Sequence, residues 1–294
     1  MEVDEKMKYG VLYSYWGNEW KCDYAATAKK VKEAGFDIIE IGAGHLLEMS
    51  EKQLDGFKHV CNQLKLSITA NIGPAKDKDV ASSDPKVRKA GIQFLTDIMV
   101  KMDLIDCRKI VGVMYTYWPN DFSDLDKDAI WERGAKSVRE LGGIAKDLNI
   151  EMCLEIVNRF ETHIINTVSE GIRFCKEVNV PSVKLLLDTF HMNIEEDNIA
   201  DAIREAGDYI GELHVGEGNR KLPGKGSVSW NEIGNALRDI HFTGSVVMEP
   251  FVLKGGQVGK DIKVWRDLSG HADEAKLSSE LAESLRFLKK RFLD

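Results

Sequence analysis

Four side chains of the kinds that bind hard metal ions stand at the ends of four apolar segments in the second half of the chain. The segments are MCLEI, LLLDT, ELHVG and VVMEP, and the side chains are Glu155, Asp188, His214 and Glu249. Three carboxylates and one imidazole suit Mn²⁺, Mg²⁺ or Co²⁺ better than a structural thiolate zinc site would. Without a cation, three crowded carboxylates would repel one another and raise one another's pKa. The set therefore predicts a divalent metal site, provided that the fold brings the four side chains together.

Each of these residues also has a structural explanation when it is taken alone. A single acid at the end of a strand is more often a helix N-cap or a salt-bridge partner than a ligand, and a single histidine can be a hydrogen-bonded core residue. A purely structural explanation would require four such partners at the same position of four consecutive segments, which is much less common than one. The quartet, considered together, favours metal binding.

Further polar and aromatic residues follow the same segments. Glu161 comes six residues after Glu155, His191 three after Asp188, and Arg220 six after His214. Each could instead be structural: Glu161 could begin a helix, His191 could cap a turn, and Arg220 could pair with a surface acid. Aromatic residues after two apolar runs in the first half of the chain could pack against the C–H face of a sugar or simply fill the core; they are Tyr13, Trp16, Trp20 and Trp118.

Eight β-rich runs separated by helical patterns could bring these residues together. The runs are 9–16, 37–43, 67–73, 109–116, 151–157, 183–190, 210–217 and 244–251. Between them, segments such as 24–36, 133–149 and 166–179 have apolar residues at three- and four-residue spacing, and Gly or Asn near the end. Strict alternation predicts an α/β fold, a (β/α)8 TIM barrel with parallel strands and outer helices. In such a barrel the carboxyl ends of all strands meet at one mouth, where active sites lie.

The alternative architecture is a doubly wound open sheet, but no GxGxxG motif follows the first run. No linker or low-complexity tract divides the chain, so one domain is expected over 1–294. Residues 1–6 are interpreted as an N-terminal extension and 272–294 as the C-terminal helix.

Composition narrows the class of protein. The 294-residue chain has a formal net charge of −8, which argues against nucleic-acid binding. Its five cysteines are widely spaced without a CxxC pair, so reduced thiols are expected. No apolar run is long enough to span a membrane and no secretory signal begins the chain, so we expect a cytoplasmic location.

The position of the two glutamates in the quartet indicates a reaction. Glu155 and Glu249 arise from the fifth and eighth runs, so they could approach a metal-bound hydroxy-ketone from opposite sides. One carboxylate could remove a carbon-bound proton from one face while the other returns a proton to the second face. This is two-base epimerisation through an enediolate that the ion stabilises.

Several longer segments are distinctive: YSYWGNEW, YTYWPNDF, CLEIVNRFE, LLLDTFHMNIEED, HVGEGNRKLPGKG, GSVVMEPFV and IKVWRDLSGHADE. Together they resemble the D-tagatose 3-epimerase family, most closely its D-psicose (D-allulose) 3-epimerases. The resemblance runs from about Met7 to the C-terminal helix. It implies a homotetramer or dimer of (β/α)8 subunits that uses Mn²⁺ or Co²⁺ to interconvert D-fructose and D-psicose at C3 through a cis-enediolate.

The resemblance also implies roles for individual residues. Glu155 and Glu249 would be metal ligands and the catalytic acid/base pair, with Asp188 and His214 completing the coordination. Glu161, His191 and Arg220 would bind the O1 and O2 end of the ketose, and Trp20 and Trp118 would form apolar walls near its far end.

Leu12 departs from the family pattern, because several relatives have an aromatic residue there. A leucine cannot hydrogen-bond a hydroxyl, so Leu12 leaves the choice among D-psicose, D-tagatose and D-sorbose open. Two other functions stay possible at this stage: an aldose–ketose isomerase of the same superfamily, and a non-catalytic sugar-binding module whose metal orders its loops. An apurinic endonuclease is disfavoured by the acidic charge and the few histidines.

Overall fold

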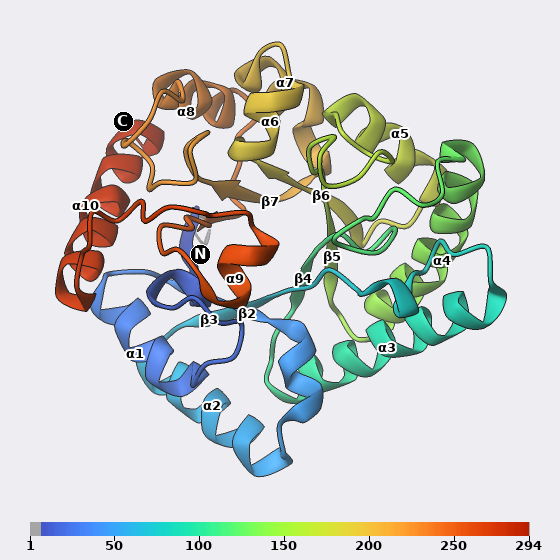
Figure 1. The fold of residues 1–294 in the computed structure, drawn as a ribbon, viewed down its shortest axis with the longest axis horizontal. Helices are drawn as coiled ribbons and strands as arrows, with labels where there is room; N and C mark the ends of the chain where they lie inside the picture. The colour runs from blue at the N-terminus through green and yellow to red at the C-terminus, as the bar shows by residue number, and fades with distance from the viewer. Residues whose placement is uncertain (1–6, 294) are drawn as a thin grey trace, which may run out of the picture.

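The computed structural model describes residues 7–293, and its centre is a closed barrel of eight strands in sequence order (Figure 1). Every neighbouring pair is parallel, including the closing pair β1 and β8. The strands are β1 (Lys8–Leu12), β2 (Ile38–Gly42), β3 (Ser67–Asn71), β4 (Lys109–Gly112), β5 (Glu151–Glu155), β6 (Val183–Asp188), β7 (Ile210–Val215) and β8 (Ser245–Met248). The predicted (β/α)8 class is confirmed, and the open-sheet alternative is excluded.

Helices surround the barrel and bury their apolar faces against it (Figure 1). They are α1 (Tyr24–Glu33), α2 (Glu51–Leu64), α3 (Pro85–Leu104), α4 (Lys127–Asp147), α5 (Val168–Val178), α6 (Thr189–Glu195), α7 (Ile199–Ala206), α8 (Trp230–Asp239), α9 (Gly256–Asp261) and α10 (Glu274–Leu293). Short 3-10 turns are η1 (Tyr13–Trp16), η2 (Ala43–Glu48), η3 (Lys76–Lys78) and η4 (Gly207–Tyr209). No helix among residues 7–293 is long and apolar enough to cross a membrane.

The ends of the predicted helices coincide with residues in left-handed backbone conformation. Gly35, Asn149 and Asn179 all have positive φ angles just after α1, α4 and α5, as expected for residues that terminate helices. The last helix begins at Glu274, two residues later than predicted, because Asp273 stands before it and accepts a hydrogen bond from the Lys276 backbone N–H. The predicted extension 1–6 lies outside the described residues.

Several strands are shorter than the sequence predicted. The first ends at Leu12, because the next four residues coil into η1. The fourth ends at Gly112, whose φ of +118° departs from strand geometry. The sixth ends at Asp188, whose carboxylate accepts the Phe190 backbone N–H and so begins α6. Apolar residues continue past each end, so the apolar pattern alone predicts longer strands.

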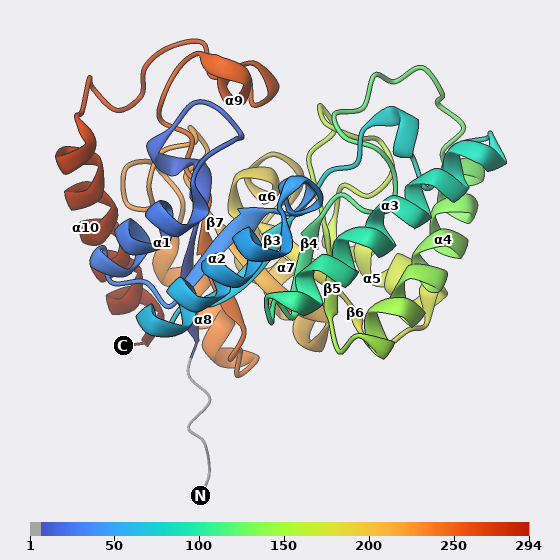
Figure 2. The same ribbon diagram turned by 90° about the horizontal axis from the view of Figure 1, so that it is seen from below.

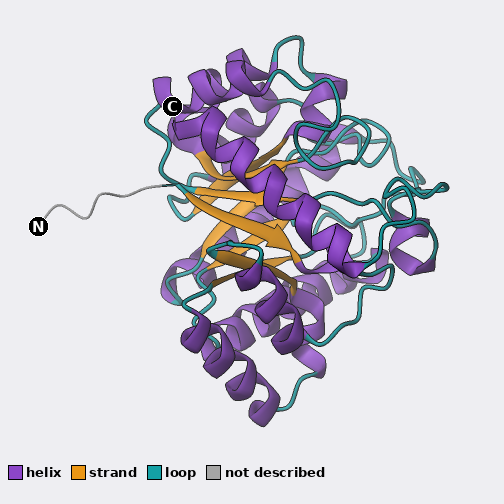
Figure 3. Cartoon of the chain, turned by 90° about the vertical axis from the view of Figure 1, so that its left-hand side faces the viewer, coloured by secondary structure: helices purple, strands orange, loops and turns teal. Residues whose placement is uncertain are grey.

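The strands point toward the side of the molecule where most of the loops gather (Figure 3). On this side the segment that follows β8 carries α9 over the end of the barrel (Figure 2). The barrel thus places the carboxyl ends of its strands beneath long loops, which is the arrangement that forms a site in this fold.

Candidate active site

The four predicted metal ligands converge at this end of the barrel. Glu155 ends β5, Asp188 ends β6, His214 is the next-to-last residue of β7, and Glu249 directly follows β8. Asp188 and His214 are register partners on neighbouring strands. Each of the four residues offers one ligand atom, and these atoms lie within 4.8 Å of one another. All four residues are buried, so the sequence correctly predicted their convergence.

The donor set fits a divalent cation. Burial, and then repulsion from Glu249, raise the pKa of Glu155 well above its usual value, and burial also raises the pKa of Asp188. Nδ1 of the fully buried His214 has no hydrogen-bond partner among the described residues and lies 3.6 Å from Glu249 Oε1, whereas Nε2 faces two other buried carboxylates. Crowded acids and an unpartnered Nδ1 atom beside them are both features that a bound cation would stabilise.

Asp188 combines a structural contact with a position in the quartet. Its Oδ1 atom accepts the Phe190 backbone N–H at 2.6 Å and caps α6, as the structural explanation expected. Its Oδ2 atom lies 4.0 Å from His191 Nε2 and 3.9 Å from Arg220 Nη1. A helix-capping role and a metal-binding role are therefore compatible for Asp188, because Oδ1 caps the helix and Oδ2 is free to bind a cation.

His191 is held in one tautomer by the main chain. The Asn158 backbone N–H donates to its Nδ1 atom at 3.1 Å, so Nδ1 accepts and the ring proton is on Nε2. Burial lowers the pKa of His191, which favours the neutral ring. Nε2 lies 3.6 Å from Glu155 Oε1, and His191 is one of the residues that line a cavity at this end of the barrel. His191 thus presents an N–H donor beside the quartet, and does not cap a surface turn.

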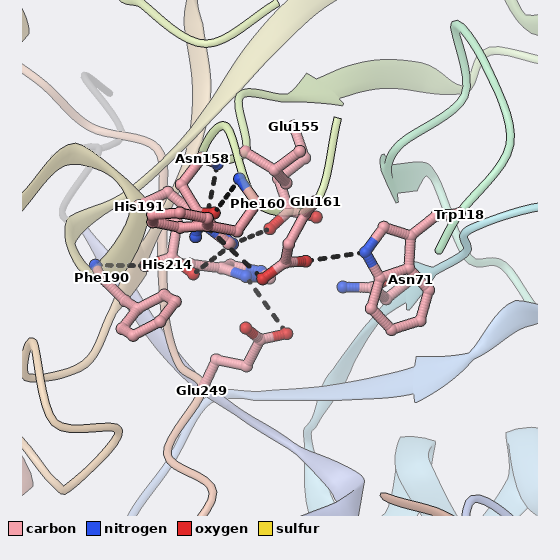
Figure 4. A network of polar contacts seen from close by, with 12 residues as sticks. Asn71, Trp118, Glu155, Asn158, Phe160, Glu161, Phe190, His191, His214 and Glu249 are labelled. Carbon is pink, nitrogen blue, oxygen red and sulfur yellow. Dashed lines mark hydrogen bonds and ion pairs between the residues drawn. The ribbon is translucent and has the colours of Figure 1, made fainter. Parts of the chain in front are cut away.

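Arg220 and Glu161 are also drawn to the quartet. The guanidinium of Arg220 stacks over the Phe190 ring, 3.5 Å from its centroid. It lies 3.5 Å from both Glu161 Oε1 and Glu249 Oε2, so it does not pair with a surface acid. Glu161 accepts the indole N–H of Trp118 at 2.7 Å (Figure 4). Its position is therefore fixed by side chains from other loops.

A cavity of about 470 Å³ opens above the quartet. Its lining includes many of the predicted contacts: Leu12, Tyr13, Trp20, Trp118, Glu155, Glu161, His191, Arg220 and Glu249. Trp16 does not line it, because its indole N–H donates to Ser278 on α10; of the two roles considered for this residue, packing against the core is the one that the structure gives it. Trp20 is oriented by a hydrogen bond from its indole N–H to Asp261, at the end of α9.

Sequence reasoning missed several residues around the site. Phe190 and Phe251 flank Arg220, and Asn158 orients His191. Phe190 and Phe251 occur in the motifs TFH and EPF beside the quartet, so proximity in sequence was an available signal. Two buried acids inside the barrel, Glu40 and Glu212, were missed as well; each interrupts an apolar strand pattern.

Comparison with known proteins shows what this chain is similar to. Residues 28–290 match the family model of xylose isomerase-like TIM barrels. The chain is 46% identical to the D-psicose 3-epimerase of Agrobacterium fabrum over 96% of this chain and 98% of that protein. It is 31% identical to the L-ribulose 3-epimerase of a Methylomonas species, over 99% and 100% of the two chains.

A solved structure agrees with these sequence similarities. The crystal structure of D-psicose 3-epimerase with D-tagatose from Clostridium cellulolyticum H10 superposes with a TM-score of 0.96 at 46% identity, and covers 97% of this chain and 99% of that chain. The predicted resemblance is confirmed over nearly the whole length.

Proposed function

The chain belongs to the xylose isomerase-like TIM barrels and, within them, to the ketose 3-epimerases that include the D-psicose 3-epimerases; from this premise we propose that it interconverts D-fructose and D-psicose at C3. The observation that carries the proposal is the position of Glu155 and Glu249. In Figure 4 they reach toward the same space from opposite sides, with the His214 ring between them in this view. Two carboxylates facing one cavity suit two-base epimerisation.

The side chains around the cavity would hold the carbonyl end of the ketose. His191 presents a neutral Nε2–H group, and Arg220 has buried N–H groups without hydrogen-bond partners among the described residues. Both groups can donate to O1 or O2 of a ketose. Their donated hydrogen bonds would withdraw charge from the C2 carbonyl and make the C3 proton more acidic.

Proton transfer would then use the two glutamates. One carboxylate takes the proton from C3, the electron pair of the C–H bond forms the C2–C3 double bond of a cis-enediolate, and the π electrons of the C2 carbonyl move onto O2. The other glutamate, in its protonated form, delivers a proton to the opposite face of C3, while the C2–O2 double bond forms again. The two residues exchange roles in the reverse reaction, and the protonation states are restored by exchange with solvent.

Glu155, Asp188, His214 and Glu249 are the residues that would hold the divalent cation, for which Mn²⁺ and Co²⁺ are the proposed identities. When bound, the cation supplies a positive charge that stabilises developing negative charge on the ketose oxygens. Glu155 and Glu249 would thus both hold the cation and transfer protons, whereas Asp188 and His214 would only hold it.

The preference among ketoses depends on the wall opposite the carbonyl end. Leu12 is buried and lines the cavity together with Trp20 and Trp118. An aliphatic side chain offers no hydrogen bond there, so we propose that D-tagatose and D-sorbose are also epimerised, more slowly than D-fructose. Homo-oligomerisation, the cytoplasmic location and the single-domain organisation stay predictions.

Isotope exchange tests the reaction. With D-fructose and Mn²⁺ in deuterated water, we expect D-psicose to form with deuterium at C3, detected by NMR. Deuterium at C1 or C2 without exchange at C3 would identify an aldose–ketose isomerase instead. Absence of both conversion and exchange, with sugar binding retained, would favour a sugar-binding module.

Substitution tests the two glutamates. We expect E155Q and E249Q each to lower kcat by more than about 10⁴-fold, because each removes a general acid–base group and a metal ligand together. The matched control is E132Q, because Glu132 is an exposed acid on α4 whose one ion pair among residues 7–293 is with Lys136. Its kcat should stay within about twofold of wild type. Turnover that survives E155Q or E249Q contradicts the two-base assignment.

A further inference from the structure

Two fully buried acids lie inside the barrel beneath the quartet and belong to no part of the proposed reaction. Glu40 stands on β2 and Glu212 on β7, and neither has any exposed surface. His214 Nε2 lies 3.0 Å from Glu40 Oε1 and 3.4 Å from Glu212 Oε1. The other nitrogen of the same ring, Nδ1, faces Glu249. The imidazole thus has Glu249 of the quartet on its Nδ1 side and a second pair of carboxylates on its Nε2 side.

We propose that Glu40 and Glu212 are positioning residues that hold His214 with Nδ1 turned toward the quartet, and that they thereby set the affinity of the site for its divalent cation. The inference rests on the metal site of the proposed function. An imidazole that gives one nitrogen to a metal must carry its proton on the other, and a carboxylate acceptor there fixes both the tautomer and the ring orientation.

Glu40 is itself anchored as an acceptor. The Thr69 hydroxyl donates to its Oε2 atom at 2.9 Å, and the Asn71 side-chain amide donates to its Oε1 atom at 3.3 Å. Both donors come from the neighbouring strand β3. A carboxylate fixed by two donors cannot rotate away from His214, so the ring it contacts is fixed as well.

Glu212 adds a second acceptor on the same edge of the ring. Although Nε2 is close to both carboxylates, it makes no hydrogen bond of good geometry among the described residues. We therefore expect the N–H group to point between the two oxygens. Loss of either acid should then weaken the hold on His214, and loss of Glu40, which is closer and better anchored, should weaken it more.

The contacts of the pair favour an anchoring role over a second metal site. The Lys109 ammonium lies 3.8 Å from Glu212 Oε2, and it also donates to Gly211 O and Ser245 Oγ. A lysine cation already offsets charge here, and the oxygens of Glu40 are engaged by hydrogen-bond donors. Both features oppose a second divalent ion at this position.

Metal affinity measured without substrate tests the inference. We would remove metal from wild type, E40Q and E212Q with a chelator and titrate each with Mn²⁺ at one pH, following free Mn²⁺ by electron paramagnetic resonance. E40Q should raise Kd about 10- to 100-fold, the range typical when such a partner of a metal-bound histidine is lost, and E212Q should raise it less. Wild type should bind one Mn²⁺ per chain.

Glu151 supplies the matched control, because it is an acid at the opposite end of the barrel that contacts Lys109, at 3.1 Å, and not His214. E151Q should leave Kd within about threefold of wild type. Equal affinities in all four proteins would overturn the inference. Two Mn²⁺ per chain in wild type and one in E40Q would overturn it too, because the pair would then be a metal site.

A merely structural role is distinguished by spectroscopy. Loaded with Co²⁺, E40Q should show visible d–d bands shifted from those of wild type, because the His214 ligand is reoriented, whereas E151Q should not. If E40Q does not fold, T69V removes one donor to Glu40 and should weaken Mn²⁺ binding in the same direction; a folded T69V with wild-type Kd would overturn the inference. Absence of Mn²⁺ binding by wild type would refute the metal site itself. If the variants show the expected order of Mn²⁺ affinities but wild type does not epimerise ketoses, only the proposed function would be refuted.

Discussion

Arg220 has buried N–H groups that a bound ketose could satisfy. Its Nε and Nη1 atoms are buried without hydrogen-bond partners among the described residues, and its guanidinium carbon lies over the Phe190 ring, 3.5 Å from the centroid. We expect R220K to lower kcat/KM for D-fructose about 10- to 100-fold, mainly through KM, because lysine keeps the charge but loses the planar donors. Steady-state kinetics with saturating Mn²⁺ measures this.

R159K is the control for R220K. Arg159 follows the same strand as Glu155 and pairs with Glu195, but it is exposed and makes no contact with the quartet. Its kcat/KM should stay within about twofold of wild type. A normal KM in R220K would mean that charge alone is sufficient, and that the stacked orientation does not hold the ketose.

The sequence predicted the quartet because each member lies at or beside the end of an apolar strand, and a parallel barrel brings such ends together. It could not have predicted the tautomer of His191, because that depends on a backbone N–H 33 residues away in the chain. Glu40 was missed for a different reason. It interrupts an apolar strand pattern, but the sequence does not show what the acid faces; only the closed barrel places His214 of β7 beside it.

At the scale of elements, the barrel and its helical segments follow from periodicity, but strand ends do not. Asp188 shows why: the apolar residues continue past it, whereas the hydrogen bond from Phe190 turns the chain into α6. One capping side chain therefore sets where the strand ends, and the pattern of apolar residues does not show this.

Helix α4 offers a pair of adjacent glycines that separates packing from helix propensity. A Cβ atom on Gly142 would lie 2.7 Å from Val183 Cγ2 at the start of β6, whereas one on Gly143 would meet nothing within 4 Å. We expect G142A to lower the free energy of unfolding by about 1–2 kcal/mol through overpacking against the barrel. Urea denaturation followed by circular dichroism measures the change.

G143A is the matched control on the same helix. Alanine there should raise the free energy of unfolding by about 0.5–1 kcal/mol, because it reduces backbone entropy in the unfolded chain and adds no contact. The opposite signs would show that α4 is fixed by its fit to β6. A gain in stability in both variants would instead show that Val183 and its neighbours shift to accommodate the added methyl group.

The molecule as a whole buries most of its tyrosines, and this sets its stability in alkali. Burial raises the pKa of Tyr9 to about 12, and it raises the pKa of Tyr15, Tyr24 and Tyr115 above the usual value as well. Because the folded state disfavours the ionised phenol, the stability that these groups contribute is complete below pH ~10 and is lost as pH rises through their folded pKa values.

We therefore expect the melting temperature to fall steadily above pH ~10, and tyrosinate absorbance at 295 nm to rise together with loss of the circular dichroism signal. Y9F is the informative variant, because the Tyr9 hydroxyl is buried without a hydrogen-bond partner among the described residues. Its ring would stay beneath Lys289, 5.2 Å from the ammonium. Y9F should match wild type at pH 8 and lose less stability by pH 11. Ionisation of the tyrosines near pH 10 in a fully folded protein would contradict this account, because the phenols would then be reaching water without the barrel opening.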